Sequence, residues 1–576
     1  MGCPFYLKHM KKYRWQLLII LVTGLIVGIL LIIQQMDDGE EARSTPSPIS
    51  GGVYTEALIG EFMRLNPFLD LYNEPDRAVD QLIFNSLVKF DSRGIPQTDL
   101  AESWGVSKDG TVYNFSLRTD VYWHDGEPFD SQDVLYTLGL LQSQHNLIPE
   151  DFRNFWAEVE VVALSDIQIQ FLLPEPFAPF LDYLSFGILP EHLLGGLGME
   201  DLVDHPFNLA PVGTGPFRFQ RLVVENEEIA GVVLEAFDAY FLDRPYLDEF
   251  IFRYYSNSEE AIAAYQEGEV EGIGDVHSSI LGDVLSEPDL AVYTTREPLL
   301  TMIYLNLDNP EVGFLQNPDF RRALMASINR EMIIEQVFNG QAVPANGTIL
   351  PGTWAYYNDL EKVPFNAIEA KHLFESTGVT FDEEAEIFRS ETDLEIALTL
   401  LHPDTPEHTE IAELIQSDWE DLGIDVSLES KPYENVLEEL SLRNYETALV
   451  DINYTRSPDP DPYPFWAQAQ IQSGQNYAEW DNRSASEFLE QARMTADIGE
   501  RERLYRNFQV LFVRELPSLP LFYSVYTYAA TEDLKDINLG PLFEPSDRFN
   551  NVHDWYILSG VDTNGKEDIE ATEIID

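Results

Sequence analysis

The sequence predicts an α/β protein with at least two packed lobes. The chain has 576 residues, more than a single hydrophobic core normally organises. Segments in which apolar residues alternate with polar ones, as in strands, occur between segments of helical periodicity. This order of segments is typical of α/β folds. A hydrophobic content of 44%, with 12% aromatic residues, is sufficient for large globular cores.

The charge of the chain is strongly negative. It has 100 acidic and 35 basic residues, which gives a formal net charge of −65. Because this charge repels phosphate backbones and anionic lipid surfaces, we expect no nucleic-acid partner. Two interpretations of the acidity remain open, namely a solvated surface that keeps the protein soluble and the attraction of a cationic ligand.

The N-terminal region has the features of a membrane segment. Residues 1–14 are basic, and Trp15–Ile33 is an apolar run of about the length that spans a bilayer. A polar segment follows instead of the small-residue cleavage site of a secretory signal. Residues 34–50, acidic and then rich in Ser, Thr and Pro, predict a flexible stalk. We therefore predict a cytoplasmic N-terminus, an uncleaved transmembrane anchor with a signal as the alternative, and a body outside the cell membrane.

The stretch from residue 99 to residue 133 predicts two turns and a strand between them. Lys108–Gly110 and His124–Gly126 each contain Asp-Gly, which tolerates the positive φ of a tight turn. Between the turns, the apolar residues that alternate with polar ones are Tyr113, Phe115 and Leu117. This alternation predicts a strand with one buried face.

Helix signals follow at several places. Asp130, with Asp133 three residues later, predicts a capped helix start. Asn317 and Pro318 predict the start of a long helix that ends near Gly340. An apolar face over residues 411–422 is closed by a glycine, and residues 424–428 alternate as a strand.

Several strings, in this order, resemble one protein family. The strings DLAESW, KDGTVYNFSLR and WHDGEPFDSQDV resemble the peptide/nickel class of solute-binding proteins, family 5, which feed ATP-driven importers. Further similar segments are Asn208–Phe219, Tyr246–Ile273, Pro318–Pro344 and Ser457–Trp466. The resemblance covers about residues 51 to 535.

The resemblance implies an α/β fold of the periplasmic-binding-protein type II-like class, with two lobes, a discontinuous first domain and a hinged cleft. Residues 51–305 would form lobe 1, with a small domain inserted at about 96–205. Residues 306–525 would form lobe 2, residues 526–560 would return to lobe 1, and residues 561–576 would be an acidic tail. The implied function is that of an extracytoplasmic, monomeric solute-binding protein of an ABC importer. It would capture a small organic ligand, peptide-like or other, and meet the permease subunits.

Catalytic signatures are scarce in the sequence. Motifs of zinc proteases, α/β-hydrolases, P-loops and dinucleotide-binding folds do not occur. Gly213-Thr214-Gly215 offers part of a phosphate loop, but Pro216 follows, so a turn before a strand is favoured. His124 beside Asp125 is an acid–base candidate that a tight turn explains better. We expect no enzyme and no cofactor, with a secreted hydrolase or a membrane-anchored sensor as the alternatives.

Metal binding is not expected either. Cys3 is the only cysteine, so no cysteine cluster can form. Asp459-Pro460-Asp461 resembles a calcium loop, but the prolines restrict φ and the loop glycine is missing. We expect Asp459 to cap a helix that begins at Pro460.

The family resemblance also implies candidate ligand contacts. In peptide-binding relatives the position of Arg456 holds an Asp that pairs with the ligand ammonium, which a guanidinium cannot do. Arg456 would instead bind a carboxylate, a phosphate or a ring, or else pair with a local carboxylate such as Asp459 or Asp461. The ligand-binding candidates are Asn66, Asn453, Thr455, Arg456, Asp459, Asn476, Tyr477 and Trp480. Local packing or turn formation remains the alternative for the asparagines and aromatic residues among them.

Overall fold

The computed structural model describes residues 48, 50–143, 145–382, 384, 387–389 and 396–558. The chain divides into two compact units, and the unit Ser50–Ile557 contains the elements described below. The predicted segments 1–14 and 15–33, most of the predicted stalk 34–50 and the predicted acidic tail 561–576 lie outside the described residues.

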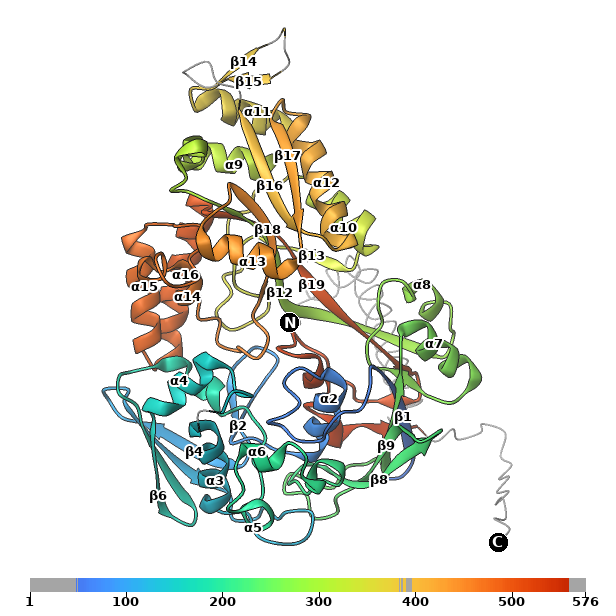
Figure 1. Ribbon diagram of the computed structural model, residues 1–576. Helices are drawn as coiled ribbons and strands as arrows, with labels where there is room; N and C mark the ends of the chain where they lie inside the picture. Colours follow the sequence, from blue (N-terminus) through green and yellow to red (C-terminus); the bar gives the residue numbers. More distant parts are fainter. Residues whose placement is uncertain are drawn as a thin grey trace, which may run out of the picture. The chain divides into compact units, whose positions relative to one another are not determined.

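Among the described residues, the largest sheet is a mixed sheet of eleven strands (Figure 1). Its strand order is β17 (Asp425–Lys431), β16 (Ala397–Pro403), β18 (Thr447–Asn453), β12 (Leu290–Leu305), β19 (Ser518–Thr531), β11 (Gly272–Ile273), β1 (Val53–Ile59), β10 (Glu249–Tyr255), β9 (Glu228–Ala236) and β8 (Phe217–Glu225), with β13 (Ala342–Pro344) paired to β19. The parallel β1–β10 and β16–β17 pairs agree with an α/β class, because parallel strands need crossover connections.

The long strands β12 and β19 join the two halves of this sheet. Their antiparallel pairing shifts register between Arg296 and Leu300. Pro298 lies within this shift, where a residue without an N–H group interrupts no regular ladder. The chain passes here between the predicted lobes 51–305 and 306–525. We therefore expect the hinge at this position, and the lobe boundaries stay a prediction.

Two apolar cores cover the two faces of the half that contains β16, β18 and the end of β12. Because side chains alternate along a strand, Ile303 and Leu305 enter one core, whereas Met302 and Tyr304 enter the other. The helices of the first core are α9 (Pro318–Ser327), α10 (Arg330–Phe338), α11 (Ala367–Ser376) and α12 (Pro406–Glu420). Those of the second core are α13 (Tyr433–Leu442), α14 (Tyr463–Trp466), α15 (Arg483–Met494) and α16 (Ile498–Glu515).

A third core joins the other half of the large sheet to a separate four-stranded sheet. The strands of this smaller sheet, in spatial order, are β4 (Ala101–Val106), β5 (Val112–Leu117), β7 (Gln168–Leu172) and β6 (Glu160–Ser165). The helices of this part are α2 (Glu74–Ile83), α3 (Ser131–Gln142), α4 (Glu150–Glu158), α5 (Glu191–Leu194) and α6 (Met199–Leu202); α7 (Ser258–Glu267) and α8 (Leu281–Val284) surround a smaller core. Two-stranded pairs are β2 (Val88–Phe90) with β3 (Pro96–Thr98), β14 (Thr380–Asp382) with β15 (Ile387–Arg389), and β20 (Leu534–Lys535) with β21 (Tyr556–Ile557).

The structure confirms the strand and the capped helix predicted between residues 99 and 133. In β5 the residues Tyr113, Phe115 and Leu117 are buried, and Asn114 is exposed. At the start of α3 the carboxylate of Asp130 accepts a hydrogen bond from the backbone N–H of Gln132 at 2.6 Å. The carboxylate of Asp133 accepts one in return from the backbone N–H of Asp130 at 3.0 Å, which completes a capping box.

Two helix predictions need correction. The single helix expected from Asn317 to Gly340 is two helices, because Ile328 leaves helical geometry and Asn329 caps α10 by accepting a hydrogen bond from the backbone N–H of Met332. The helix expected to start at Pro460 is also wrong. The short helix α14 begins three residues later, at Tyr463.

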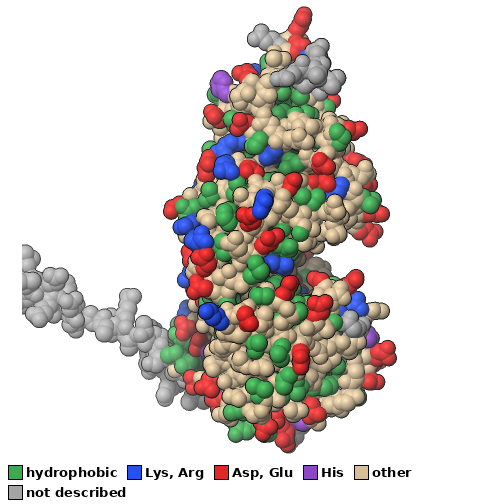
Figure 2. Space-filling view, turned by 90° about the vertical axis from the view of Figure 1, so that its left-hand side faces the viewer, with side chains coloured by type: hydrophobic (Ala, Val, Ile, Leu, Met, Phe, Trp, Pro, Cys, Tyr) green, Lys and Arg blue, Asp and Glu red, His purple; other side chains and the backbone are tan. Residues whose placement is uncertain are grey.

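Acidic side chains are spread over the face of the molecule in Figure 2. Lysine and arginine side chains lie between them, and a hollow indents one edge of this face. The dispersal agrees with a solvated acidic surface more than with one acidic patch.

Candidate ligand-binding site

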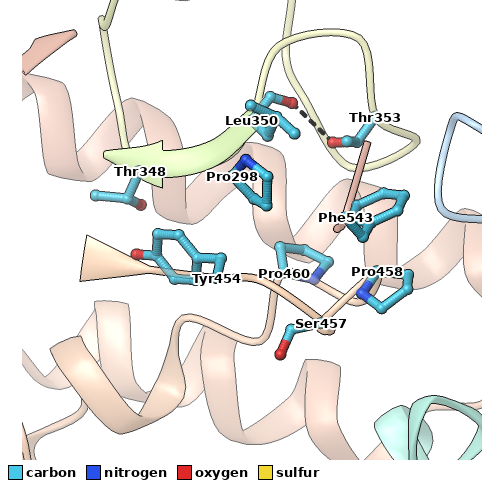
Figure 3. Close-up of a pocket in the computed structure, with 9 residues that line it drawn as sticks. All are labelled: Pro298, Thr348, Leu350, Thr353, Tyr454, Ser457, Pro458, Pro460 and Phe543. Carbon is cyan, nitrogen blue, oxygen red and sulfur yellow. Dashed lines mark hydrogen bonds between the residues drawn. The ribbon is translucent and has the colours of Figure 1, made fainter. Parts of the chain in front are cut away.

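A cavity with an empty volume of about 280 Å³ lies where four distant segments of the chain meet (Figure 3). The segments are β12, the loop after β13, the loop after β18 and the segment after β20. The lining residues are Pro298, Thr348, Leu350, Thr353, Tyr454, Ser457, Pro458, Pro460 and Phe543. Cavities where separate parts of a fold meet are the usual place for small-molecule sites.

The loop after β18 turns sharply at Arg456 to form one wall. Arg456 has a φ of 62°, in the left-handed region. Its backbone N–H donates a hydrogen bond to the carbonyl of Phe543 at 2.9 Å, and that of Ser457 donates to the carbonyl of Tyr454 at 3.2 Å. The two prolines that follow restrict φ and stiffen the loop. The wall is therefore held by backbone geometry.

Two buried hydroxyl groups of the cavity lack hydrogen-bond partners among the residues that the structure describes. They belong to Thr348 and Tyr454, which are 3% and 8% exposed. Figure 3 shows both hydroxyls at the same side of the cavity. Burial raises the pKa of Tyr454, so its hydroxyl stays protonated and able to donate. In contrast, the hydroxyl of Thr353 already donates to the carbonyl of Leu350 at 2.8 Å.

The guanidinium of Arg456 lies beside the cavity wall and pairs with two carboxylates from distant segments. Its Nε atom is 3.1 Å from Oε2 of Glu544, and its Nη2 atom is 3.7 Å from Oδ1 of Asp70. Glu544 also pairs with Arg77 at 3.3 Å. These partners are not the local Asp459 or Asp461 that the sequence suggested.

Asp70 is the buried member of this cluster. Its side chain is 4% exposed, and burial raises the pKa of its carboxyl to about 7, although the nearby charges of Arg456 and Arg77 lower it. The carboxyl of Asp70 therefore changes charge near neutral pH, next to a guanidinium from the other predicted lobe.

Asp459 takes part in an internal network. Its carboxylate pairs with Arg501 at 2.5 Å and accepts hydrogen bonds from the hydroxyl of Tyr505 and the backbone N–H of Asp461, both at 3.2 Å. The backbone N–H of Asp459 donates to Asp182 at 2.8 Å. Among the described residues, no group of three or more His, Cys, Asp or Glu side chains is placed to hold a metal ion.

The candidates after α14 lie away from the cavity lining. The amide of Asn476 donates to two backbone carbonyls, one of them that of Trp480, and is fully buried. The indole of Trp480 donates to Glu515 at 3.0 Å, and the ring of Tyr477 meets that of Tyr304 edge to face. These contacts stabilise the packing of one core.

The remaining candidates differ in their positions. Asn66 is fully buried, and its amide donates to Asn208 at 3.0 Å. Asn453 ends β18 with an exposed side chain that accepts a hydrogen bond from the backbone N–H of Thr455 at 2.7 Å. None of the eight candidates is among the lining residues. Asn453, Thr455, Arg456 and Asp459 are next to lining residues in the sequence, whereas the other four candidates lie elsewhere.

Sequence reasoning missed three of the lining residues that matter most. Tyr454 stands inside the segment that was singled out, and an aromatic ring directly after a buried strand is a signal that could have found it. Thr348 and Phe543 carry no local signal, because only the tertiary fold brings them to Tyr454.

His124, the acid–base candidate, is bound to backbone groups. Its Nδ1 atom accepts a hydrogen bond from the N–H of Gly213 at 3.2 Å, and its Nε2–H group donates to the carbonyl of Gly215 at 3.0 Å. Burial lowers the pKa of His124 to about 4, so the ring is neutral at pH 7. Asp125 pairs with His192 at 2.8 Å and not with His124.

A second, more polar cavity has an empty volume of about 320 Å³. Glu74, Asp275 and Arg548 contribute to its lining. The guanidinium of Arg548 is already paired with the buried carboxylate of Glu56 at 2.7 Å.

Known proteins resemble this chain in sequence. The dipeptide-binding protein of Escherichia coli is 25% identical over 484 residues, which cover 80% of this chain and 87% of the relative. The peptide transport periplasmic protein SapA of Salmonella typhimurium is 27% identical over 484 residues, which cover 77% of this chain and 81% of the relative.

Solved structures share the fold. The structure of HbpA2 from Haemophilus parasuis matches with a TM-score of 0.75 at 21% identity, over 86% of this chain and 99% of that chain. The match confirms the predicted fold class, α/β and periplasmic-binding-protein type II-like.

The predicted location as a single-pass membrane protein is wrong. The relative from Salmonella typhimurium is named a periplasmic protein. In the part of the chain that the structure describes, no helix has both the length and the apolar character to cross a membrane. The anchor was predicted for Trp15–Ile33, which lies outside the described residues. The prediction relied on a basic flank and an apolar run, two features that secretory signals share.

A family model extends the match over most of the folded unit. The model of the bacterial extracellular solute-binding proteins, family 5, matches residues 96–475. This range contains the lining residues from Pro298 to Pro460. The chain therefore belongs to the bacterial extracellular solute-binding proteins of family 5.

Proposed function

We propose that this chain captures a small peptide-like solute in the cavity beside Tyr454 and delivers it to the permease of an ABC importer. The observation that carries the proposal is the cavity itself. Its walls come from four distant segments, and the two buried hydroxyls of Thr348 and Tyr454 have no partner among the described residues. Unpartnered buried polar groups are rare in folded proteins, and a bound ligand would satisfy them.

The names of the relatives support a peptide-like ligand. One is a dipeptide-binding protein, and another is a peptide transport protein. The capture of a ligand between two lobes usually proceeds by hinge closure. The register shift at Pro298 supports a hinge at the boundary between the proposed lobes 51–305 and 306–525.

The proposed role is binding without catalysis. The family is named for solute binding. In addition, both ring nitrogens of His124 are engaged by backbone groups, which leaves no free nitrogen to move a substrate proton.

The candidate residues divide into two proposed roles. Asn453, Thr455 and Arg456 flank Tyr454 and would border the ligand. Asn66, Asp459, Asn476 and Trp480 would position the walls, because their polar atoms are engaged inside the fold. The ring of Tyr477 packs against Tyr304 and would act in the same way.

Calorimetric titration of the full chain with short peptides tests the proposal. We expect Ala-Tyr-Ala or a related tripeptide to bind, and Tyr454→Trp to weaken that binding by at least about tenfold, because the larger ring fills the cavity. A matched control is Tyr265→Trp in α7, which is outside the lining and should leave the affinity unchanged. Binding to Tyr454→Trp with full affinity would place the ligand elsewhere, and no peptide binding at all would refute the proposed ligand class.

A further inference from the structure

We infer that the cavity receives an uncharged, mainly apolar group of the ligand, which the hydroxyls of Tyr454 and Thr348 bind by hydrogen bonds. The inference rests on the proposed function and specifies which chemical group of the solute enters the site. It follows from the lining, the state of the two hydroxyls, the charges nearby and the size of the cavity.

The lining is mainly apolar and has no charged side chain. Five of its nine lining residues are apolar, namely three prolines, Leu350 and Phe543. An ammonium or carboxylate that entered would lose its hydration without meeting an opposite charge, which is strongly unfavourable. An aromatic or aliphatic group would instead leave water and contact the apolar walls, which is favourable.

The charged residues closest in sequence are engaged with other partners. The guanidinium of Arg456 pairs with Glu544, and the carboxylate of Asp459 pairs with Arg501. None of these four charged residues lines the cavity, and each pair brings together opposite charges that compensate each other. The cavity therefore disfavours charged ligand groups, because its walls offer no charged partner for them.

The two hydroxyls give the cavity a defined polar end. Both belong to side chains that are more than nine-tenths buried, and neither has a hydrogen-bond partner within the described residues. The indole N–H of Trp466 lies close to the Tyr454 hydroxyl and acts to lower the pKa of Tyr454, but burial has the larger effect and the pKa is raised overall. The Tyr454 oxygen thus faces a donor, which leaves its own O–H group for an acceptor on the ligand.

The volume limits the size of the bound group. The empty volume of about 280 Å³ includes space that is open to solvent, so it is an upper limit on the room for a bound group. It suits one side chain better than a whole oligopeptide. A phenol or a similar ring with one polar atom meets both the apolar walls and the two hydroxyls.

A panel of four tripeptides tests the preference for an uncharged group. The probes are Ala-Tyr-Ala, Ala-Phe-Ala, Ala-Lys-Ala and Ala-Glu-Ala, titrated into the full chain by calorimetry. We expect the two aromatic peptides to bind at least about tenfold more tightly than the two charged ones, and Ala-Tyr-Ala to bind most tightly because its hydroxyl can pair with Tyr454 or Thr348.

Removal of each hydroxyl tests the polar end. Tyr454→Phe and Thr348→Val should each weaken the binding of Ala-Tyr-Ala by about tenfold. The unfolding temperature of the ligand-free variants should stay unchanged or rise, because a buried unpartnered group is removed. The matched control is Tyr254→Phe in β10, whose hydroxyl is also buried and without a partner among the described residues but does not line the cavity. It should leave the affinity unchanged.

The possible outcomes separate this inference from the proposed function. If the unmodified chain binds the charged peptides as tightly as the aromatic ones, or if both hydroxyl variants keep full affinity, the inference is refuted and peptide capture stands. If the unmodified chain binds none of the four peptides, the proposed peptide capture and the inference both fail.

Discussion

The environment of Arg456 shows how a single residue can connect distant parts of the chain. Its guanidinium is 36% exposed and lies within ion-pair distance of Glu544 and Asp70. Burial holds the pKa of Asp70 at about 7, well above the ordinary value for an aspartate, and Arg456 is the main charge that lowers it. The strength of this contact should therefore depend on pH.

We expect Arg456→Gln to destabilise the protein more above neutral pH than below it. Because the pKa of folded Asp70 is raised, the stabilisation that it contributes is fully present below about pH 4 and is lost as the pH rises through about 7. Without Arg456 the pKa of Asp70 rises further, so the ionisation of Asp70 in the folded protein above pH 7 becomes more unfavourable. Urea titrations should show that Arg456→Gln lowers the free energy of unfolding by roughly 0.5 kcal/mol at about pH 5.5 and by roughly 1 kcal/mol at about pH 8. Both losses are small because the guanidinium is partly exposed.

Arg483→Gln is the matched control for this experiment. Arg483 pairs with Glu487 at 2.7 Å, and its side chain is 85% exposed. Its replacement should leave the free energy of unfolding nearly unchanged at both pH values, because a salt bridge between exposed side chains contributes little. Equal losses for Arg456→Gln at the two pH values would contradict the proposed coupling to Asp70.

Among the secondary-structure elements, Gly213 and Gly215 show how a motif that suggests chemistry can serve packing. The backbone N–H of Gly215 donates to the carbonyl of Ile83 at 2.7 Å, at the end of α2. A Cβ atom on Gly213 would overlap the carbonyl oxygen of Ile83, and one on Gly215 would overlap that of Leu82. The two glycines are needed because two backbone segments approach closely there.

We expect Gly213→Ala to lower the free energy of unfolding by more than about 2 kcal/mol, since the added methyl group forces the backbone segments apart. Gly139→Ala in α3 is the control, because a Cβ atom there has no heavy atom within 4 Å. Alanine favours a helix over glycine, so this variant should be more stable by about 0.5 to 1 kcal/mol. Denaturant titrations measure both changes, and similar stability for Gly213→Ala and the unmodified chain would refute the packing explanation.

Elements with strong local signals were predictable from sequence. Asp130 and Asp133 define the start of α3 through contacts within three residues, and the alternation from Tyr113 to Leu117 defines β5. The break after α9 was not predicted, because the prediction used only the start signal at Asn317 and the end signal at Gly340, and the capping residue Asn329 lies between them. The start of α14 was also missed, because Asp459 bonds to Arg501 in α16 rather than capping a helix.

Across the whole molecule, sequence reasoning identified the fold class but only part of the candidate site. The fold class followed from many separate motifs in a fixed order, and the family match over residues 96–475 agrees with it. The cavity could not be predicted in the same way, because Phe543 and Thr348 reach Tyr454 only through the tertiary fold. Candidates such as Asn476 and Trp480 lie in a segment that was singled out, yet their polar atoms are engaged within one core.

A crystal structure of the chain with bound Ala-Tyr-Ala tests the central claim most directly. We expect the central side chain of the peptide to lie between Phe543 and Tyr454, with its hydroxyl at a hydrogen-bond distance of about 2.5 to 3.0 Å from the Tyr454 or Thr348 oxygen. A peptide bound outside this cavity, for example in the polar cavity beside Glu74 and Asp275, would contradict the account.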